Sequence, residues 1–204
     1  MPNKPKSGKL IVIYGANNLG KTTQAKLLVE NLIVRMGIEA EYLKYAIYNL
    51  EPSGPLITSY LRQNNPYQFT PREFQMLQVL NRTQNDTKLK EKLNKGTYIV
   101  AEDYIGTGIA WGMAEGVDKE LLIQLNTHLR KEDLGILFFG EPYRETLDKT
   151  NIHETNPMML EKVNDNFKSL AEDFGWHIIN ANQSIEQIHE EILDIIKSKL
   201  ITLD

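Results

Sequence analysis

Short apolar runs and longer amphipathic stretches alternate along the chain. Residues 10–14 (LIVIY) form a continuous apolar run that Gly15 ends. Such a run is typical of a strand that is buried on both faces of a parallel sheet. Further strands are predicted at about 39–46, 97–101, 134–139 and 176–180.

Between these strands, apolar residues recur at the spacing of helices. Two segments, 70–73 (TPRE) and 184–187 (SIEQ), have the pattern of a capping box, which marks a helix start. Gly37 and Gly175 follow the last periodic residues of two other stretches, as glycines do at helix C-termini. The predicted helices span about residues 25–36, 70–93, 156–174 and 185–195.

A phosphate-binding loop joins the first strand to the first helix. Residues 15–22 (GANNLGKT) match G-x-x-x-x-G-K-[ST] without a gap, in the strand–helix context that this motif requires. Loop amides and the helix N-terminus bind phosphate oxygens, Lys21 places a charge on the β and γ phosphates of ATP, and the Thr22 hydroxyl suits Mg²⁺. The expected phosphate-binding residues are Gly15, Ala16, Asn17, Asn18, Leu19, Gly20, Lys21, Thr22 and Thr23.

Together, the alternating elements and the loop predict an α/β protein. We expect the three-layer α/β/α fold of P-loop NTPases, with a five-stranded parallel sheet in a single domain over residues 1–204. Residues 1–8 are polar and are expected to form a flexible tail. The stretch at about 140–155 lacks apolar periodicity and is a candidate for a small lid. A GTPase is less favoured, because the chain has no N-K-x-D guanine motif, and the chain is short for a motor protein.

Composition narrows the class further. The 204 residues include no Cys, which excludes a disulfide scaffold, Cys-ligated zinc, iron–sulfur centres and cysteine nucleophiles. The net charge of −4 gives no bulk attraction to nucleic acid or to anionic membranes. No run approaches the ~20 apolar residues of a membrane span, and the start lacks a signal-peptide core, so a cytoplasmic protein is expected. Only six of the 23 basic residues are Arg, although phosphate chemistry commonly uses Arg.

With the phosphate loop, several motifs resemble those of the thymidylate kinase family. They are 14–24 (YGANNLGKTTQ), 54–61 (GPLITSYL), 81–82 (NR), 89–97 (LKEKLNKGT), 104–111 (YIGTGIAW) and 181–186 (ANQSIE). The resemblance covers about residues 9–196. It implies transfer of the γ-phosphoryl group of ATP to thymidine monophosphate, a step of dTTP biosynthesis. It also implies dependence on Mg²⁺, a cytosolic location, a homodimer, and no nucleic-acid or membrane partner.

The resemblance also implies roles for particular residues. The catalytic set is Lys21, Glu102, Asp103 and the lid cations Arg144 and Lys149. The acceptor-binding set is Asn17, Tyr48, Gln78, Arg82, Tyr104 and Gly108. Thr22 and Glu102 would hold Mg²⁺, partly through water, and Ala181 and Gln183 would lie beside the adenine.

At five positions the chain departs from the family pattern. Tyr48 stands where the family has an Arg on the acceptor phosphate, and Asp103 stands where it has a second Arg. Glu102 replaces an Asp, Gln78 replaces the Phe that stacks on thymine, and Asn17 replaces an acidic sugar contact or only forms the loop. Tyr and Asp cannot replace the bidentate fork of Arg. Two alternatives therefore stay open: a different (deoxy)nucleotide or nucleoside acceptor, or a nucleotide-binding relative with weak activity.

Some of these residues also have interpretations without function. An acidic pair such as Glu102 and Asp103 is an ordinary feature of a surface. Arg82 could be a surface residue paired with Asp86 one helical turn away. Tyr104 could be a half-buried aromatic with no ligand. We favour a functional role for at least one of Glu102 and Asp103, because they follow a strand at the carboxyl edge of the predicted sheet, where α/β proteins bind their ligands. We also favour a functional role for Arg82, and both interpretations of Tyr104 stay open.

Overall fold

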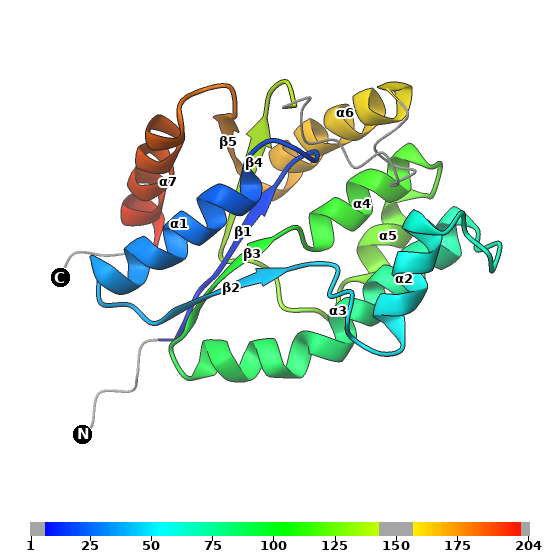
Figure 1. Cartoon of the computed structure of the whole chain (residues 1–204), viewed down its shortest axis with the longest axis horizontal. Coiled ribbons are helices and arrows are strands. Elements are labelled where there is room, and N and C mark those ends of the chain that lie inside the picture. The colour runs from blue at the N-terminus through cyan, green and yellow to red at the C-terminus, as the bar shows by residue number, and fades with distance from the viewer. Residues whose placement is uncertain (1–6, 143–156, 201–204) are drawn as a thin grey trace.

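The computed structural model describes residues 7–142 and 157–200. Five parallel strands lie in the order β2-β3-β1-β4-β5 (Figure 1). The strands are β1 (Leu10–Tyr14), β2 (Ala40–Lys44), β3 (Tyr98–Glu102), β4 (Leu134–Phe139) and β5 (His177–Asn180). The helices are α1 (Lys21–Val34), α2 (Ser53–Arg62), α3 (Pro71–Asn94), α4 (Ile105–Ala114), α5 (Lys119–Leu125), α6 (Pro157–Phe174) and α7 (Ile185–Lys199).

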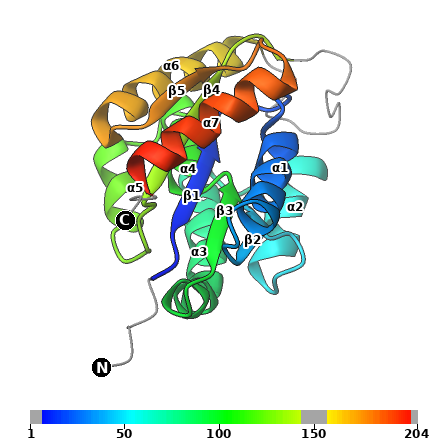
Figure 2. The ribbon, with the colours of Figure 1, turned by 90° about the vertical axis from the view of Figure 1, so that its left-hand side faces the viewer.

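Helices cover both faces of the sheet, as the predicted α/β fold requires. All five residues of β1 are buried. Its even-numbered residues belong to a core shared with α3, α4 and α6, and Ile11 and Ile13 belong to a second core shared with α1 and α7. Figure 2 looks onto the face that α1 and α7 cover. Side chains of a strand alternate between its two faces, so one apolar strand supplies both cores.

The register of the central strands decides where the polar residues meet. Ile13 of β1 pairs with Glu102 of β3, and Glu102 pairs in turn with Lys44 of β2. All three residues lie at the carboxyl ends of their strands. The phosphate loop after β1 and the acidic pair of Glu102 and Asp103 are therefore neighbours at one edge of the sheet, where such folds bind ligands.

Both predicted capping boxes are present. The Thr70 side chain accepts a hydrogen bond from the backbone N–H of Glu73, whose carboxylate accepts one from the Thr70 backbone N–H. Ser184 and Gln187 form the same reciprocal pair at the start of α7. A small apolar cluster then fixes α2 against the first turns of α3, and the rings of Tyr60 and Phe74 are stacked with centroids 3.8 Å apart.

The predicted strands and helices are confirmed, with small shifts at their ends. The strand expected at 97–101 covers Tyr98–Glu102, so Glu102 is the last residue of the strand. The expected tail reaches too far, because the Gly8 amide donates a hydrogen bond to the carbonyl of Leu93 at 2.7 Å. A Cβ at Gly8 would lie 2.0 Å from the Thr97 carbonyl oxygen, so this residue is packed against the end of α3. Most of the predicted lid lies outside the described residues. No helix among the residues described is long and apolar enough to cross a membrane.

The packing of α6 gives a test of the fold. Phe167 is fully buried in the core beneath α6, whereas Phe174 at the end of the same helix is 43% exposed. We expect Phe167→Ala to lower the free energy of unfolding by about 3–5 kcal/mol, because it leaves a cavity. Urea titration measures the loss, and Phe174→Ala is the matched control with a smaller expected effect. Equal losses for the two variants would contradict this placement of α6.

Candidate active site

The phosphate loop, residues 15–20, has the backbone conformation that its glycines predict. Gly15 has φ = 132°, and a Cβ there would lie 2.5 Å from the carbonyl oxygen of Phe138 on β4. Only glycine fits that close approach. Lys21 is almost fully buried, and its Nζ donates hydrogen bonds to the carbonyls of Gly15 at 2.8 Å and Ala16 at 2.7 Å. The loop therefore holds its own lysine at the N-terminus of α1.

In front of the loop lies a cavity of about 640 Å³, which we call the donor cavity. Its lining combines the loop and the start of α1 with residues of β2, β3, α2 and α7. The lining residues are Asn17, Asn18, Leu19, Gly20, Lys21, Thr22, Thr23, Gln24, Lys44, Arg62, Glu102, Ile185 and Ile188. Backbone amides, lysine and a helix N-terminus around one cavity form a site for a polyphosphate.

Glu102 is the most heavily hydrogen-bonded carboxylate of this site. Its Oε2 accepts from Thr22 Oγ1 at 2.7 Å and from the Tyr42 hydroxyl at 2.6 Å, and its Oε1 accepts from Lys44 Nζ at 2.7 Å. Burial raises the pKa of Glu102, but the hydrogen bonds from Lys44, Tyr42 and Thr22 outweigh it, so the pKa lies below the ordinary 4.5. Glu102 is therefore a buried, fixed anion, 2.7 Å from the Thr22 hydroxyl at the start of α1.

Asp103 is in a different environment from its neighbour. It has φ = 63°, in the left-handed region, and its Oδ1 accepts a hydrogen bond from Thr107 Oγ1 at 3.0 Å. The same oxygen lies 3.8 Å from Lys21 Nζ. Burial raises the pKa of Asp103 above its ordinary value, although Lys21 opposes the shift. This carboxyl group is therefore easier to protonate than Glu102.

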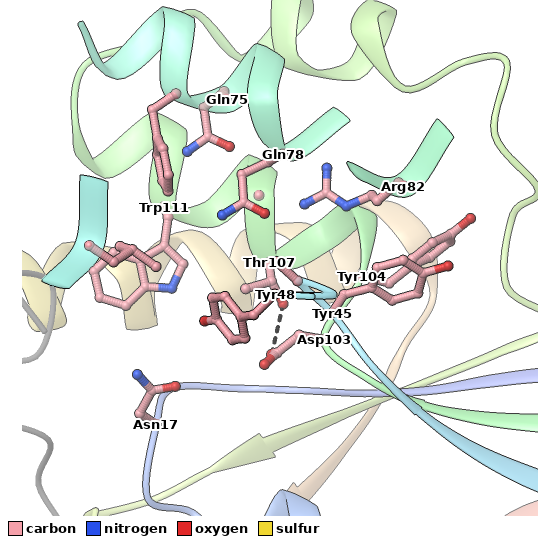
Figure 3. A pocket seen from close by; sticks show the side chains of 14 residues that line it. Asn17, Tyr45, Tyr48, Gln75, Gln78, Arg82, Asp103, Tyr104, Thr107 and Trp111 are labelled. Atoms are coloured by element: carbon pink, nitrogen blue, oxygen red, sulfur yellow. Dashed lines mark hydrogen bonds between the residues drawn. The ribbon is translucent and has the colours of Figure 1, made fainter. Parts of the chain in front are cut away.

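A second cavity, the acceptor cavity, opens beside Asp103 (Figure 3). It is bounded by the phosphate loop, the segment after β2, and helices α2, α3 and α4. The lining residues are Asn17, Tyr45, Ala46, Tyr48, Leu61, Phe74, Gln75, Gln78, Arg82, Asp103, Tyr104, Thr107, Gly108 and Trp111. All six residues predicted to bind the acceptor are among them. Asn17 lines both cavities, so the two adjoin at the phosphate loop.

Arg82 lines the acceptor cavity from α3. The residue is only 3% exposed, and its Nη1 donates a hydrogen bond to Asn126 Oδ1 at 3.2 Å. Its Nε and the Tyr104 hydroxyl are buried without a hydrogen-bond partner among the described residues. The alternative of a surface Arg82 paired with Asp86 is wrong, because α3 turns Arg82 into the cavity and Asp86 pairs with Lys90. Buried polar atoms without partners are the groups that a polar ligand would satisfy.

Ala181 and Gln183, the two residues predicted to lie beside the adenine, do not line the donor cavity. Ala181 is buried in the core with α7, and Gln183 Nε2 donates to the Asn180 carbonyl and lies 3.3 Å from Glu191 Oε2. Neither lines the donor cavity, where Ile185 does. The lid cations Arg144 and Lys149 lie outside the described residues.

Several lining residues were not predicted from the sequence. Gln75 lies three residues before the predicted Gln78 on α3, and Trp111 lies three residues after the predicted Gly108 on α4. Helical spacing from these predicted residues would therefore have found both. Lys44 enters the site through its pairing with Glu102, which requires the strand register. Arg62, the last residue of α2, also lines the donor cavity, and neither a motif nor helical spacing from a predicted residue indicates it.

The fold and the cavities define a P-loop phosphotransferase architecture, and comparison with known proteins gives the family. A sequence profile of thymidylate kinase matches residues 13–192. The chain is 31% identical to thymidylate kinase of Schizosaccharomyces pombe over 212 residues, covering 99% of each chain. It is 31% identical to the human thymidylate kinase over 191 residues, covering 91% of this chain and 88% of that one. The chain therefore belongs to the thymidylate kinase family.

Solved structures agree on the fold. A thymidylate kinase structure from Candida albicans superposes with a TM-score of 0.78 at 23% identity, covering 94% of this chain and 92% of that chain. One from Ehrlichia chaffeensis gives a TM-score of 0.75 at 17% identity, covering 93% of this chain and 99% of that chain. The five-stranded parallel sheet with its P-loop is thus the fold that these proteins share.

The hydrogen bonds of Glu102 predict how stability depends on pH. Because its pKa in the folded state lies below the ordinary 4.5, its stabilisation is complete above that pH and is lost as the pH falls through the lower value. We expect Glu102→Gln to lower the free energy of unfolding at pH 7 by about 1–3 kcal/mol, since the Gln amide cannot satisfy all three donors. Urea titrations should show the difference from wild type shrinking below pH 4.5. The exposed Glu161→Gln is the control, and a pH-independent loss would contradict this account.

A second prediction concerns Gly108. A Cβ at this position would lie 2.4 Å from Nη2 of Arg82, so Gly108→Ala must displace the guanidinium. We expect the KM for the acceptor nucleotide to rise by about tenfold or more and the KM for ATP to stay unchanged. The control is Gly37→Ala, where the added Cβ meets nothing within 4 Å but φ is 64°. Steady-state kinetics distinguish the two variants, and a normal acceptor KM in Gly108→Ala would be the contradicting result.

Proposed function

We propose that this chain phosphorylates thymidine monophosphate with ATP and yields thymidine diphosphate and ADP. The observation that carries the proposal is the junction of the two cavities. The cavity lined by every predicted acceptor residue lies against the P-loop, with Asp103 Oδ1 3.8 Å from Lys21 Nζ. A nucleoside monophosphate in one cavity and ATP in the other would meet at this junction. Membership of the thymidylate kinase family supports thymidine as the nucleoside.

The donor side supplies positioning and charge. Lys21 and the loop amides bind the β and γ phosphates, which requires Lys21 to leave the Gly15 and Ala16 carbonyls that it now binds. Phosphoryl transfer needs little covalent help from a protein, because the transferred group passes through a loose transition state. The contribution of these residues is therefore alignment of the two phosphates and neutralisation of their charge.

The same residues are suited to Mg²⁺. Thr22 and Glu102 place a hydroxyl and a carboxylate 2.7 Å apart beside the loop, and oxygen ligands are those that Mg²⁺ prefers. The Lys44 ion pair on Glu102 favours contact with the ion through water. Bound with ATP, Mg²⁺ would supply charge neutralisation at the transferred phosphoryl group. The described residues include no cluster of three acidic or histidine side chains for a metal, so the phosphates of ATP would complete its coordination.

The acceptor side supplies recognition of the base and sugar. The buried Nε of Arg82 has no hydrogen-bond partner within residues 7–142 and 157–200, and Gln78 lies one turn away on the same face of α3. Guanidinium and amide groups can both hydrogen-bond the edge of a pyrimidine. Tyr104 lines the same cavity and contacts Tyr45, with ring centroids 4.9 Å apart. Trp111 lines the same cavity and provides a flat apolar surface.

We also propose that the enzyme works as a cytoplasmic homodimer, as its family resemblance implies. The net charge of −4 gives no bulk attraction to nucleic acid, so no nucleic-acid partner is proposed. Analytical ultracentrifugation of the purified protein tests the homodimer, and a single species at the monomer mass of 23.4 kDa would contradict it.

The proposed activity predicts a defined acceptor preference. We expect ADP production from ATP and Mg²⁺ to depend on thymidine monophosphate, and to be weaker with deoxyuridine, deoxycytidine and guanosine monophosphates or with thymidine itself. Lys21→Ala should lower the rate by about a hundredfold or more, because it removes the charge on the transferred phosphate. A coupled assay of ADP measures both effects.

Two other outcomes of this assay would contradict the proposed activity. Turnover of thymidine in preference to its monophosphate would show a nucleoside kinase, which the loss of Arg at position 48 and at position 103 favours. ATP binding without turnover of any acceptor would contradict the proposed enzyme and leave a nucleotide-binding relative.

A further inference from the structure

Helix α3 turns three polar side chains toward the acceptor cavity. Gln75, Gln78 and Arg82 follow one another at intervals of three and four residues, so they share one face of the helix. All three line the cavity, and Figure 3 shows them projecting from α3 on the side opposite Asn17 of the phosphate loop. The phosphate of an acceptor nucleotide belongs at the junction with the donor cavity. Its base would therefore lie toward these three side chains.

Gln75 differs from the other buried amide side chains that the structure describes. Gln24, Asn81 and Asn126 each hydrogen-bond other residues through both the oxygen and the nitrogen of the amide. Gln75 is only 2% exposed, yet its carboxamide has no hydrogen-bond partner within residues 7–142 and 157–200. Burying an amide without a partner costs free energy, so a ligand that supplies the partner gains most at such a group.

Helix α4 leaves room for this face of α3 with two glycines. Gly108 and Gly112 are four residues apart and so lie on the same side of α4. A Cβ at Gly108 would lie 2.4 Å from Nη2 of Arg82, and a Cβ at Gly112 would lie 3.0 Å from Cγ of Gln75. The close approach of the two helices therefore fixes where Gln75 and Arg82 enter the cavity.

The hydrogen-bonding groups of thymine divide the work between these side chains. The base presents a donor, N3–H, between two carbonyl acceptors. Arg82 carries only N–H donors, so it can serve a carbonyl and never N3–H. A carboxamide carries an acceptor and a donor together, which suits N3–H and an adjacent carbonyl. Of the two carboxamides on this face of α3, Gln78 is only partly buried and water can satisfy it, whereas Gln75 is shielded.

We propose that Gln75 determines the base specificity of the acceptor site, because its carboxamide oxygen accepts the N3–H of thymine. The proposal rests on the proposed function and adds a specificity-determining residue to it. Arg82 then donates to a carbonyl of the same base edge. Gln75 supplies the acceptor that the arginine lacks, and the glycines of α4 hold the two groups at adjoining positions.

A simpler account of Gln75 is packing between α3 and α4, since its Cγ faces Gly112. Two substitutions distinguish packing from recognition. Gln75→Met keeps the length of the side chain and removes the hydrogen bond, whereas Gln75→Ala also opens space beside the base. Gln84 is the matched control, because it is a glutamine of the same helix that lines neither cavity and donates to the carbonyl of Glu51.

The experiment compares thymidine monophosphate with its N3-methyl analogue, which has no N3–H and carries a methyl group there. Calorimetric titration of the full chain with both nucleotides and with ATP is carried out for wild type, Gln75→Met, Gln75→Ala and Gln84→Ala. We expect both Gln75 variants to weaken binding of thymidine monophosphate about 10- to 100-fold, the range expected when a buried hydrogen bond is lost. ATP binding should stay within about twofold of wild type in every variant.

The analogue gives a readout that a loss of packing would not produce. Wild type should reject it by about a hundredfold or more relative to thymidine monophosphate, because the methyl group meets the carboxamide and leaves it unpaired. Gln75→Ala should bind the analogue at least about fivefold more tightly than wild type does, since the space of the lost side chain accepts the methyl group. Gln75→Met should show no such gain, and Gln84→Ala should resemble wild type with all three ligands.

Three results would overturn the role of Gln75. The first is a Gln75→Met variant that binds thymidine monophosphate as wild type does. The second is a Gln75→Ala variant that gains no affinity for the analogue. The third is a Gln75→Met variant that loses ATP binding as well, because Gln75 would then only support the packing of α3 on α4.

The outcomes also separate this inference from the proposed function. Wild-type protein that fails to bind thymidine monophosphate would overturn the function and the role of Gln75 with it. Wild-type protein that binds and phosphorylates thymidine monophosphate, while Gln75→Met does so equally well, would overturn the role of Gln75 alone.

Discussion

The pairing of β3 with its two parallel neighbours is the constraint on which the site depends. Glu102 pairs with Ile13 of β1 on one side and with Lys44 of β2 on the other. The carboxyl ends of these three strands therefore lie side by side at Glu102. A shift of one residue would move Glu102 to the other face of the sheet and away from Thr22. The apolar strands fix this register, because the side chains of β1 must fill two cores at once. Packing in the interior therefore places the polar groups at the edge.

The two acidic residues at this edge, Glu102 and Asp103, have pKa values shifted in opposite directions. Glu102 is kept ionised by three donors, whereas Asp103, the next residue, accepts a hydrogen bond from Thr107 and has its pKa raised by burial. Adjacent carboxylates with opposite shifts can serve different purposes in one site. Glu102 keeps a fixed negative charge beside Thr22 and Lys44. The raised pKa of Asp103 comes from its burial, which the hydrogen bond from Thr107 and the charge of Lys21 only partly offset.

Much of this arrangement could be predicted from the sequence. The P-loop pattern has fixed spacing and a fixed strand–helix context, and both are found where the pattern placed them. Both capping boxes are present because their hydrogen bonds are local, made between residues three positions apart. The six predicted acceptor residues lie around one cavity, since the motifs that carry the family resemblance follow the strands and helices that build it. The ends of strands are harder to predict, because single hydrogen bonds decide them. The third strand, for example, ends at Glu102 and not at the predicted residue 101.

By itself the sequence determined the elements, the phosphate loop and the identity of the family, because each depends on local spacing or on motifs along the chain. It also showed that two expected arginines are absent. Only the tertiary structure decided what stands near their positions. Arg82 turns into a buried cavity, Lys44 reaches Glu102 from a neighbouring strand, and Arg62 rests on Tyr48. These contacts join residues from different elements, and their geometry follows from how the helices pack on the sheet, which no local pattern in the chain encodes.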